Sequence, residues 1–175
     1  MMWRPAILQK AEAALLDEKA TKLLGLARVL DQMLGDSFEH WAELGLEGEE
    51  RLAGIARALR PATDRLATAF GAVGLGYYDA VSDRIVAYAP SESLGALVGV
   101  SPPEDHLGRV AMRERMDKIA VGSMVRGDAM NCMHPLVRGD RVIGFTFANE
   151  SLEDIYRQMH AGSGRSYQST ESAAV

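Results

Sequence analysis

Two polar side chains interrupt an apolar stretch late in the sequence. Asn131 and His134 stand within residues 130–137 (MNCMHPLV). A buried polar group costs about 1–3 kcal/mol unless it is hydrogen-bonded. Each side chain therefore either bonds to a neighbouring backbone group or directs a donor or acceptor at a ligand. We expect the ligand role, shared with the intervening Met133 and with Asn149 in the next apolar stretch.

Two arginines have the chemistry to hold an acidic ligand, because a guanidinium binds a carboxylate through two parallel hydrogen bonds. Arg109 follows His106 by about one helical turn, and Arg126 lies in a predicted turn, so either can face inward. Solvated surface positions are the alternative. Tyr77 and Tyr88 supply apolar walls with a polar tip, or else belong to the ordinary core. The predicted ligand-binding residues are Tyr77, Tyr88, His106, Arg109, Arg126, Asn131, Met133, His134 and Asn149.

Two of these residues, His106 and His134, could also ligate haem or a metal ion, together with Cys132. Cys132 and His134 are two apart on a predicted strand and so share a face, whereas His106 would have to come from a facing helix. The sequence has no C-x-x-C-H attachment motif, but non-covalent haem needs a single axial histidine. We expect no cofactor, and a haem- or metal-binding gas or redox sensor is the alternative function.

Motifs of the common enzyme classes are missing from the sequence. It contains no G-x-S-x-G elbow, no Walker loop, no G-x-G-x-x-G after a predicted strand and no H-E-x-x-H. Cys132 in mid-strand has the character of a small buried hydrophobe. The sequence therefore predicts a protein that is not an enzyme.

Composition narrows the class of partner. The chain has 175 residues, 47% of them hydrophobic, without the run of about 20 apolar residues that a membrane span needs. The net charge of −5 argues against a nucleic-acid surface, and one cysteine fits a reducing compartment. Early charges interrupt the apolar residues too soon for a signal peptide. We expect a cytoplasmic protein that binds a small molecule or another protein.

The elements that must position these residues begin with a helical region, residues 1–72. A helix is predicted over 5–34, and a second over 49–73 with a kink at Pro61. Between them we expect a loop containing Trp41. Apolar residues of the first helix form a coiled-coil-like seam of Leu16, Ala20, Leu23, Ala27, Leu30 and Leu34. This seam predicts a homodimer formed through the N-terminal helix, with a core helix as the alternative.

Residues 73–160 have the pattern of an antiparallel sheet. Strands are predicted over 75–79, 84–89, 118–124, 130–137 and 141–149, a connecting helix over 101–116, and a short helix over 151–159. The small polar tail, 161–175, is expected to be disordered. The fold class is therefore α+β, with long N-terminal helices packed on a five-stranded antiparallel sheet.

Three runs in this region, GLGYYDAVSDRIVAYAPS, GVSPPEDHLGR and VRGDAMNCMHPLVRGDRVIGFTFANESLEDI, carry a resemblance in their order and spacing. Together they resemble the Cache/PAS-like ligand-sensing domains of bacterial two-component signalling proteins, over roughly 73–159. In the last run a proline enters the penultimate strand and a VIG turn precedes the final one, as in such domains. No kinase, DNA-binding or transmembrane segment accompanies the sensor, which implies a free-standing version.

The resemblance implies a sensor that binds a polar or anionic metabolite between the sheet and the connecting helix. It would signal through its N-terminal helices to a histidine kinase or transcriptional regulator. A ligand-free interaction adaptor is a further alternative, which a filled core would favour. On the last strand Ile143, Phe145, Phe147 and Asn149 share one face, and Gly144, Thr146 and Ala148 share the other. Alternation alone leaves open which face lines the pocket.

Overall fold

Five antiparallel strands form the centre of the protein, here a computed structural model that describes residues 6–124 and 127–168. Their order across the sheet is β2-β1-β5-β4-β3. The strands are β1 (Val73–Asp79), β2 (Arg84–Ala89), β3 (Lys118–Met124), β4 (Gly127–Arg138) and β5 (Arg141–Ser151). The helices are α1 (Ala6–Leu34), α2 (Ser37–Glu43), α3 (Gly48–Phe70), α4 (Ser91–Leu94), the single turn η1 (Gly95–Leu97), α5 (Leu107–Glu114) and α6 (Leu152–Gln168). The predicted α+β fold with a five-stranded antiparallel sheet is confirmed.

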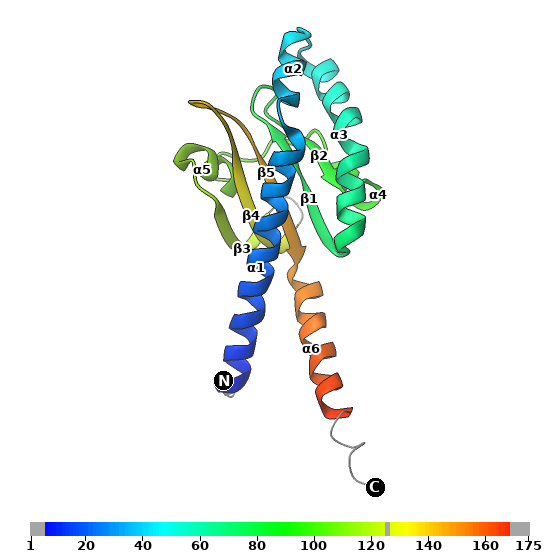
Figure 1. Ribbon diagram of the computed structural model, residues 1–175, viewed down its shortest axis with the longest axis vertical. Helices are drawn as coiled ribbons and strands as arrows, with labels where there is room; N and C mark the ends of the chain where they lie inside the picture. The colour runs from blue at the N-terminus through cyan, green and yellow to red at the C-terminus, as the bar shows by residue number, and fades with distance from the viewer. Residues whose placement is uncertain (1–5, 125–126, 169–175) are drawn as a thin grey trace.

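Helices cover the two faces of the sheet unequally. α1 and α3 share one hydrophobic cluster with sheet residues such as Leu75, Cys132 and Ala148. The opposite face carries a smaller cluster, in which Met133 and Phe145 pack with Ala111 of α5. Figure 1 shows α1 running across the sheet and projecting beyond it at one end. The result is three layers, with the long helices on one side and the short α5 on the other.

The predicted seam of α1 packs against the protein's own sheet. Leu23, Ala27, Leu30 and Leu34 are at most 1% exposed and belong to the larger cluster. Side chains buried in this way offer no surface to a second copy. The alternative of a core helix therefore describes this part of α1, and self-association through the helix stays a prediction for its first turns.

The helical region and the C-terminal helix differ from the sequence expectations at three points. The predicted loop around Trp41 contains the helix α2, and α3 continues through Pro61, whose exposed position lets water satisfy the carbonyl that proline cannot bond. α6 extends to Gln168, so residues 161–168 are helical where disorder was predicted. The rest of that tail lies outside the described residues.

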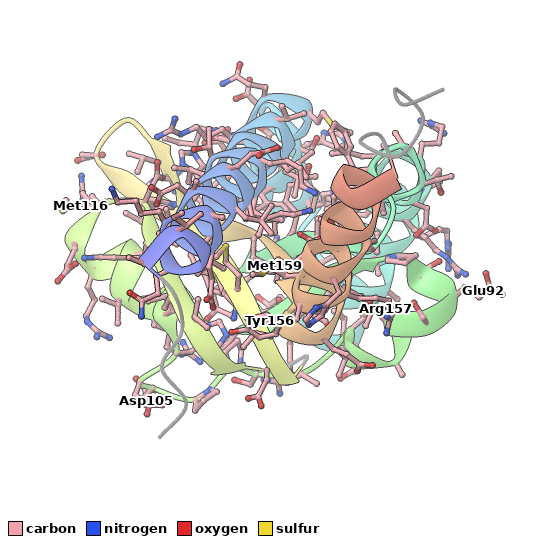
Figure 2. All side chains as sticks on the ribbon, turned by 90° about the horizontal axis from the view of Figure 1, so that it is seen from below. Glu92, Asp105, Met116, Tyr156, Arg157 and Met159 are labelled. Atoms are coloured by element: carbon pink, nitrogen blue, oxygen red, sulfur yellow. The ribbon has the colours of Figure 1, made fainter. Side chains whose placement is uncertain are left out.

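Both terminal helices project from the same end of the sheet. Seen from that end, α1 and α6 extend toward the viewer, and α6 carries Tyr156, Arg157 and Met159 (Figure 2). They are bonded to each other, because Lys19 Nζ of α1 donates to Gln158 Oε1 of α6 at 2.5 Å. Within the described residues, no helix combines the length and apolarity needed to span a bilayer.

A buried ion pair anchors α3 to the sheet. Arg51 Nε and Nη2 donate to Asp79 Oδ2 and Oδ1 at 2.9 and 3.0 Å, and both side chains are at most 2% exposed. Burial alone would raise the pKa of Asp79, but the hydrogen bonds from Arg51 and Ser82 outweigh burial and lower it. The bidentate geometry fixes α3 against the end of β1.

Replacing Arg51 with methionine removes the partner of a buried carboxylate. We expect Arg51→Met to lower the free energy of unfolding by about 3–5 kcal/mol, measured by urea denaturation at neutral pH. Arg57→Met, on the exposed side of the same helix, is the matched control and should change it by less than about 0.5 kcal/mol. Equal effects of the two substitutions would contradict this role for Arg51.

Candidate functional site

A small cavity lies between the sheet and α5, and we call it the sheet–α5 cavity. Its lining residues are Ile85, Tyr88, His106, Asn131, Met133, Phe145, Phe147 and Asn149. Its volume is about 10 Å³, close to the minimum that holds one water molecule. Five of the nine predicted ligand-binding residues, Tyr88, His106, Asn131, Met133 and Asn149, come together here.

Strand alternation and two bulges decide which side chains face the cavity. Phe145, Phe147 and Asn149 point to it from β5, as their spacing of two predicted. Ile143 instead packs with the helix-side cluster, because the register shifts opposite Leu136 and Val137 and leaves it unpaired in a bulge.

A second bulge lies in β2. The register passes from Ala87 opposite Tyr77 to Ile85 opposite Tyr78, so Val86 is the extra residue. Ile85 and Tyr88 are three positions apart, which in a regular strand would put them on opposite faces. The bulge brings both to the cavity.

His106 caps the first turn of α5 and closes one side of the cavity. Its Nδ1 accepts from the backbone N–H of Gly108 at 3.0 Å, which leaves the ring proton on Nε2. Burial, and then the nearby Arg109, lower the pKa of His106 to about 4, so the ring is neutral at physiological pH. α5 begins at Leu107, whereas the sequence predicted a helix from residue 101.

Arg109 explains the late helix start. Its Nη2 donates to Pro102 O at 2.6 Å and to Asp83 Oδ1 at 2.7 Å, and its Nη1 donates to Tyr78 Oη at 3.0 Å. These bonds hold the loop before α5 and the β1–β2 turn against the helix. Arg109 is absent from the cavity lining, so the structure gives it a positioning role where the sequence predicted contact with a ligand.

Gly108 lets α5 lie directly on an aromatic stack. A Cβ at this position would come within 2.3–2.5 Å of three ring atoms of Phe145. Phe145 stacks on Tyr78 with ring centroids 4.6 Å apart, and on His106 at 5.7 Å. Because the ring is held from several sides, any larger residue at 108 would push α5 away from the sheet.

Three polar side chains of the cavity are fully or almost fully buried. Asn149 Nδ2 donates to Tyr88 Oη at 2.8 Å. Asn131 Nδ2 donates to Ala129 O at 3.1 Å, whereas Asn131 Oδ1 has no hydrogen-bond partner among the described residues. The cavity therefore presents one buried acceptor, Asn131 Oδ1, that no described residue satisfies.

Two predicted residues lie on the opposite face of the sheet. Tyr77 Oη donates to Leu30 O at 2.6 Å, and burial raises its pKa. His134 lies between two carboxylates, with Nε2 2.8 Å from Asp31 Oδ2 and Nδ1 2.5 Å from Asp117 Oδ1. Both side chains point toward α1 and away from the sheet–α5 cavity, so their role in ligand binding stays a prediction. Arg126 lies outside the described residues.

The residues suspected of binding haem or a metal are separated by the sheet. His106 lies on the α5 side, whereas His134 and Cys132 face α1, so they cannot ligate one ion together. The Cys132 thiol lies 3.6 Å from Ala20 O, and burial, with a smaller effect of Asp117, raises its pKa to about 12. Over the described part of the chain, no group of three potential metal ligands is found.

Three lining residues, Ile85, Phe145 and Phe147, were missed as site residues. The two phenylalanines share a face with Asn149, a signal already present in their spacing. Ile85 reaches the cavity through the bulge at Val86, for which the sequence carries no signal.

Two larger clefts lie elsewhere: one of about 550 Å³ is lined by Tyr77 and by residues of α1, α2 and α3, and the other lies between α3, β2 and α4. The latter has a volume of about 590 Å³, and its rim includes Arg57, Arg60 and Asp64. Asp64 is already bonded to Ser91, and the two arginines are exposed. None of the buried side-chain atoms found without a partner in the described residues belongs to the lining of either cleft. The smaller sheet–α5 cavity is therefore the better candidate site.

Comparison with known proteins places the chain among signalling proteins. Residues 2–157 match the family model described as the AtoS N-terminal domain. The chain is 38% identical over 149 residues to the signal transduction histidine-protein kinase AtoS of Escherichia coli (strain K12). This alignment covers 85% of the chain and 24% of the kinase, so the chain spans about a quarter of that relative.

The fold is also similar to solved sensor domains. The E. coli DcuS sensor domain superposes with a TM-score of 0.53 at 12% identity, covering 84% of this chain and 98% of that domain. The sensory domain of the Campylobacter jejuni chemoreceptor Tlp3 gives a TM-score of 0.44 at 11% identity, covering 82% and 65%. At such identities the likeness to DcuS is one of fold. With the family match over nearly its whole length, the chain belongs to the AtoS N-terminal domain family.

Proposed function

We propose that this chain is a non-catalytic sensor that binds a small polar molecule in the sheet–α5 cavity and passes the bound state to α1 and α6. The observation that carries the proposal is a small, mainly apolar cavity that contains buried polar side chains and is lined by β5, the strand that continues into a junction with both helices. Membership of a signalling sensor family supports it.

The junction is built around Glu150, the residue after Asn149. Its side chain is 1% exposed, and Lys19 Nζ lies 3.3 and 3.2 Å from its two carboxylate oxygens. Lys22 Nζ lies 3.7 Å away, and Gln158 Nε2 donates to Glu150 Oε1 at 3.2 Å. One carboxylate thus joins the end of β5 to α1 and α6.

Strand pleat supplies the coupling. Successive side chains of a strand point to opposite faces, so Asn149 faces the cavity and Glu150 faces the terminal helices. α6 begins at Leu152, two residues farther on. A ligand that moves the end of β5 would therefore move both helices, provided that it binds one arrangement more tightly than the other.

The name of the E. coli relative indicates the kind of protein that would receive the signal. The E. coli relative is named as a histidine kinase and is about four times as long as the matched region. We infer that this domain regulates a kinase module, in the same polypeptide or in a separate one. A cytoplasmic location stays a prediction of the sequence.

Ligand binding is tested first by native mass spectrometry and a visible absorption scan of freshly purified protein, followed by NMR titration with a metabolite library. We expect a colourless protein, and ligands that shift the backbone amide signals of Met133, Phe147 and Asn149. A Soret band would favour the haem sensor instead. Ligands that shift only the signals of α3 would assign binding to one of the larger clefts and overturn the proposed site.

Breaking the junction should destabilise the protein. We expect Lys19→Met to lower the free energy of unfolding by about 3 kcal/mol, because Glu150 stays buried beside a weaker partner, Lys22. Lys10→Met, exposed on the same helix, is the control and should have almost no effect. In hydrogen exchange, the variant should also lose any ligand-dependent change in α6. A ligand response of α6 that survives Lys19→Met would contradict the proposed route.

The neutral His106 makes stability depend on pH. Between its unfolded pKa of 6.5 and its folded pKa of about 4, the unfolded chain binds a proton that the folded protein excludes, so acidification favours unfolding. We expect this group to remove about 2 kcal/mol of stability by about pH 5. The stability is fully present above pH 6.5 and falls with pH down to about 4.

His106→Asn is the control for this effect, because asparagine keeps an acceptor for the Gly108 N–H but does not titrate. The difference in free energy of unfolding between the wild type and His106→Asn should change by about 2 kcal/mol between neutral pH and about pH 5. Arg109 and Asp105, the charged groups that act on His106, are present in both. A difference independent of pH would show that His106 is not held neutral.

A further inference from the structure

We propose that the sheet–α5 cavity selects a small uncharged molecule that donates a hydrogen bond, of the alcohol or amide class. The inference rests on the proposed function, because it specifies the ligand of the same cavity. It departs from the anionic metabolite that the sequence suggested.

The unsatisfied acceptor is Asn131 Oδ1. The side chain is 0% exposed, and its Nδ2 donates to Ala129 O at 3.1 Å. This bond fixes the amide orientation, since the flipped amide would set its oxygen against a carbonyl oxygen. Oδ1 then has no partner within the described residues, and Asn131 lines the cavity. An O–H or N–H of a ligand would satisfy it.

The cavity carries no charge that could balance a charged ligand. Lysine, arginine, aspartate and glutamate are absent from the described lining, and His106 is held neutral. The nearest arginine identified above, Arg109, is bonded to Asp83 and to the Tyr78 hydroxyl. Either an anion or a cation would lose its hydration here without a counter-ion in the lining.

The walls limit the ligand to a few non-hydrogen atoms. The cavity as it stands has about the capacity of one water molecule, between the rings of Tyr88, Phe145 and Phe147. Phe145 is held against Gly108 and Tyr78, whereas Met133 is unbranched and can change rotamer. The ligand would therefore gain room by displacing the Met133 side chain and by occupying the space beside Asn131.

Four probes of nearly equal size separate the chemical classes: butyramide is neutral with a donor, 2-pentanone is neutral without one, butyrate is an anion and butylammonium is a cation. Each is titrated into the isotope-labelled full chain, and the side-chain amide signals of Asn131 and Asn149 are followed by NMR. We expect butyramide to bind at least about tenfold more tightly than the other three probes. Asn131→Leu should remove this preference.

A substitution that reverses the preference keeps the test independent of folding. Asn131→Asp puts one carboxyl oxygen at the acceptor position and the other beside Ala129 O, which raises the pKa of the acid, so the titration is repeated at a pH where the acid is ionised. Butylammonium should then bind more tightly than butyramide. In the ligand-free protein, Asn131→Leu should lower Tm less than Asn149→Leu does, because it removes an unsatisfied oxygen together with the bond to Ala129 O. Asn149→Leu is the matched control and should lower Tm, because it breaks the bond to the Tyr88 hydroxyl.

Different NMR results would overturn the proposed ligand class and the proposed function. Equal or tighter binding of butyrate, butylammonium or 2-pentanone, with shifts at Asn131 and Asn149, overturns the ligand class and leaves the cavity as the binding site. No shift at these residues with any of the four probes overturns the proposed function as well.

Discussion

The pleat of β5 is the constraint on which the rest of the structure depends. Its side chains alternate between two environments that share nothing but the backbone: Thr146 donates to Ala27 O on α1, whereas Phe147 faces the cavity. Because α1 fills the first environment with its apolar seam, α5 is left to close the second. The difference between the helix-covered face of the sheet and the face that lines the cavity is therefore a consequence of strand geometry, and no separate domain is needed for it.

Charge is distributed in accordance with this division. Arg51 with Asp79, Lys19 with Glu150 and Arg109 with Asp83 are ion pairs that join elements to one another. The described lining of the cavity has no such pair, and its histidine is neutral. These ion pairs position α1, α3, α5 and α6, whereas only uncharged polar groups are found in the described lining of the cavity. Unpaired charge in that space would be costly, which accounts for the separation.

Most of the fold could be predicted from the sequence because its signals are local. The alternation of apolar and polar residues predicted the positions of the strands. The order of the three sequence runs quoted above indicated the sheet and the family of sensor domains that it resembles. The site was predicted less completely, since the face to which a side chain points depends on the register between neighbouring strands. The bulge at Val86 brings Ile85 and Tyr88 to one side, and no residue pattern announces it. His134 and Tyr77 point away from the cavity for a different reason. A polar residue in a strand indicates that it has a buried partner but not on which face, and for both residues the partner lies on α1.

The small size of the cavity sets a limit on the energetics of signalling. A ligand of a few atoms gains at best about 1.5 kcal/mol for each non-hydrogen atom, and only the part that differs between two helix arrangements can drive a switch. A sensor with so little binding energy at its disposal can respond only if its resting and active arrangements already lie close in free energy. On this view the tight contact of Gly108 with Phe145 and the buried carboxylate of Glu150 do more than hold the fold together. Under the proposed function, they would set how near to balance the unliganded protein is, and hence how low a ligand concentration it could detect.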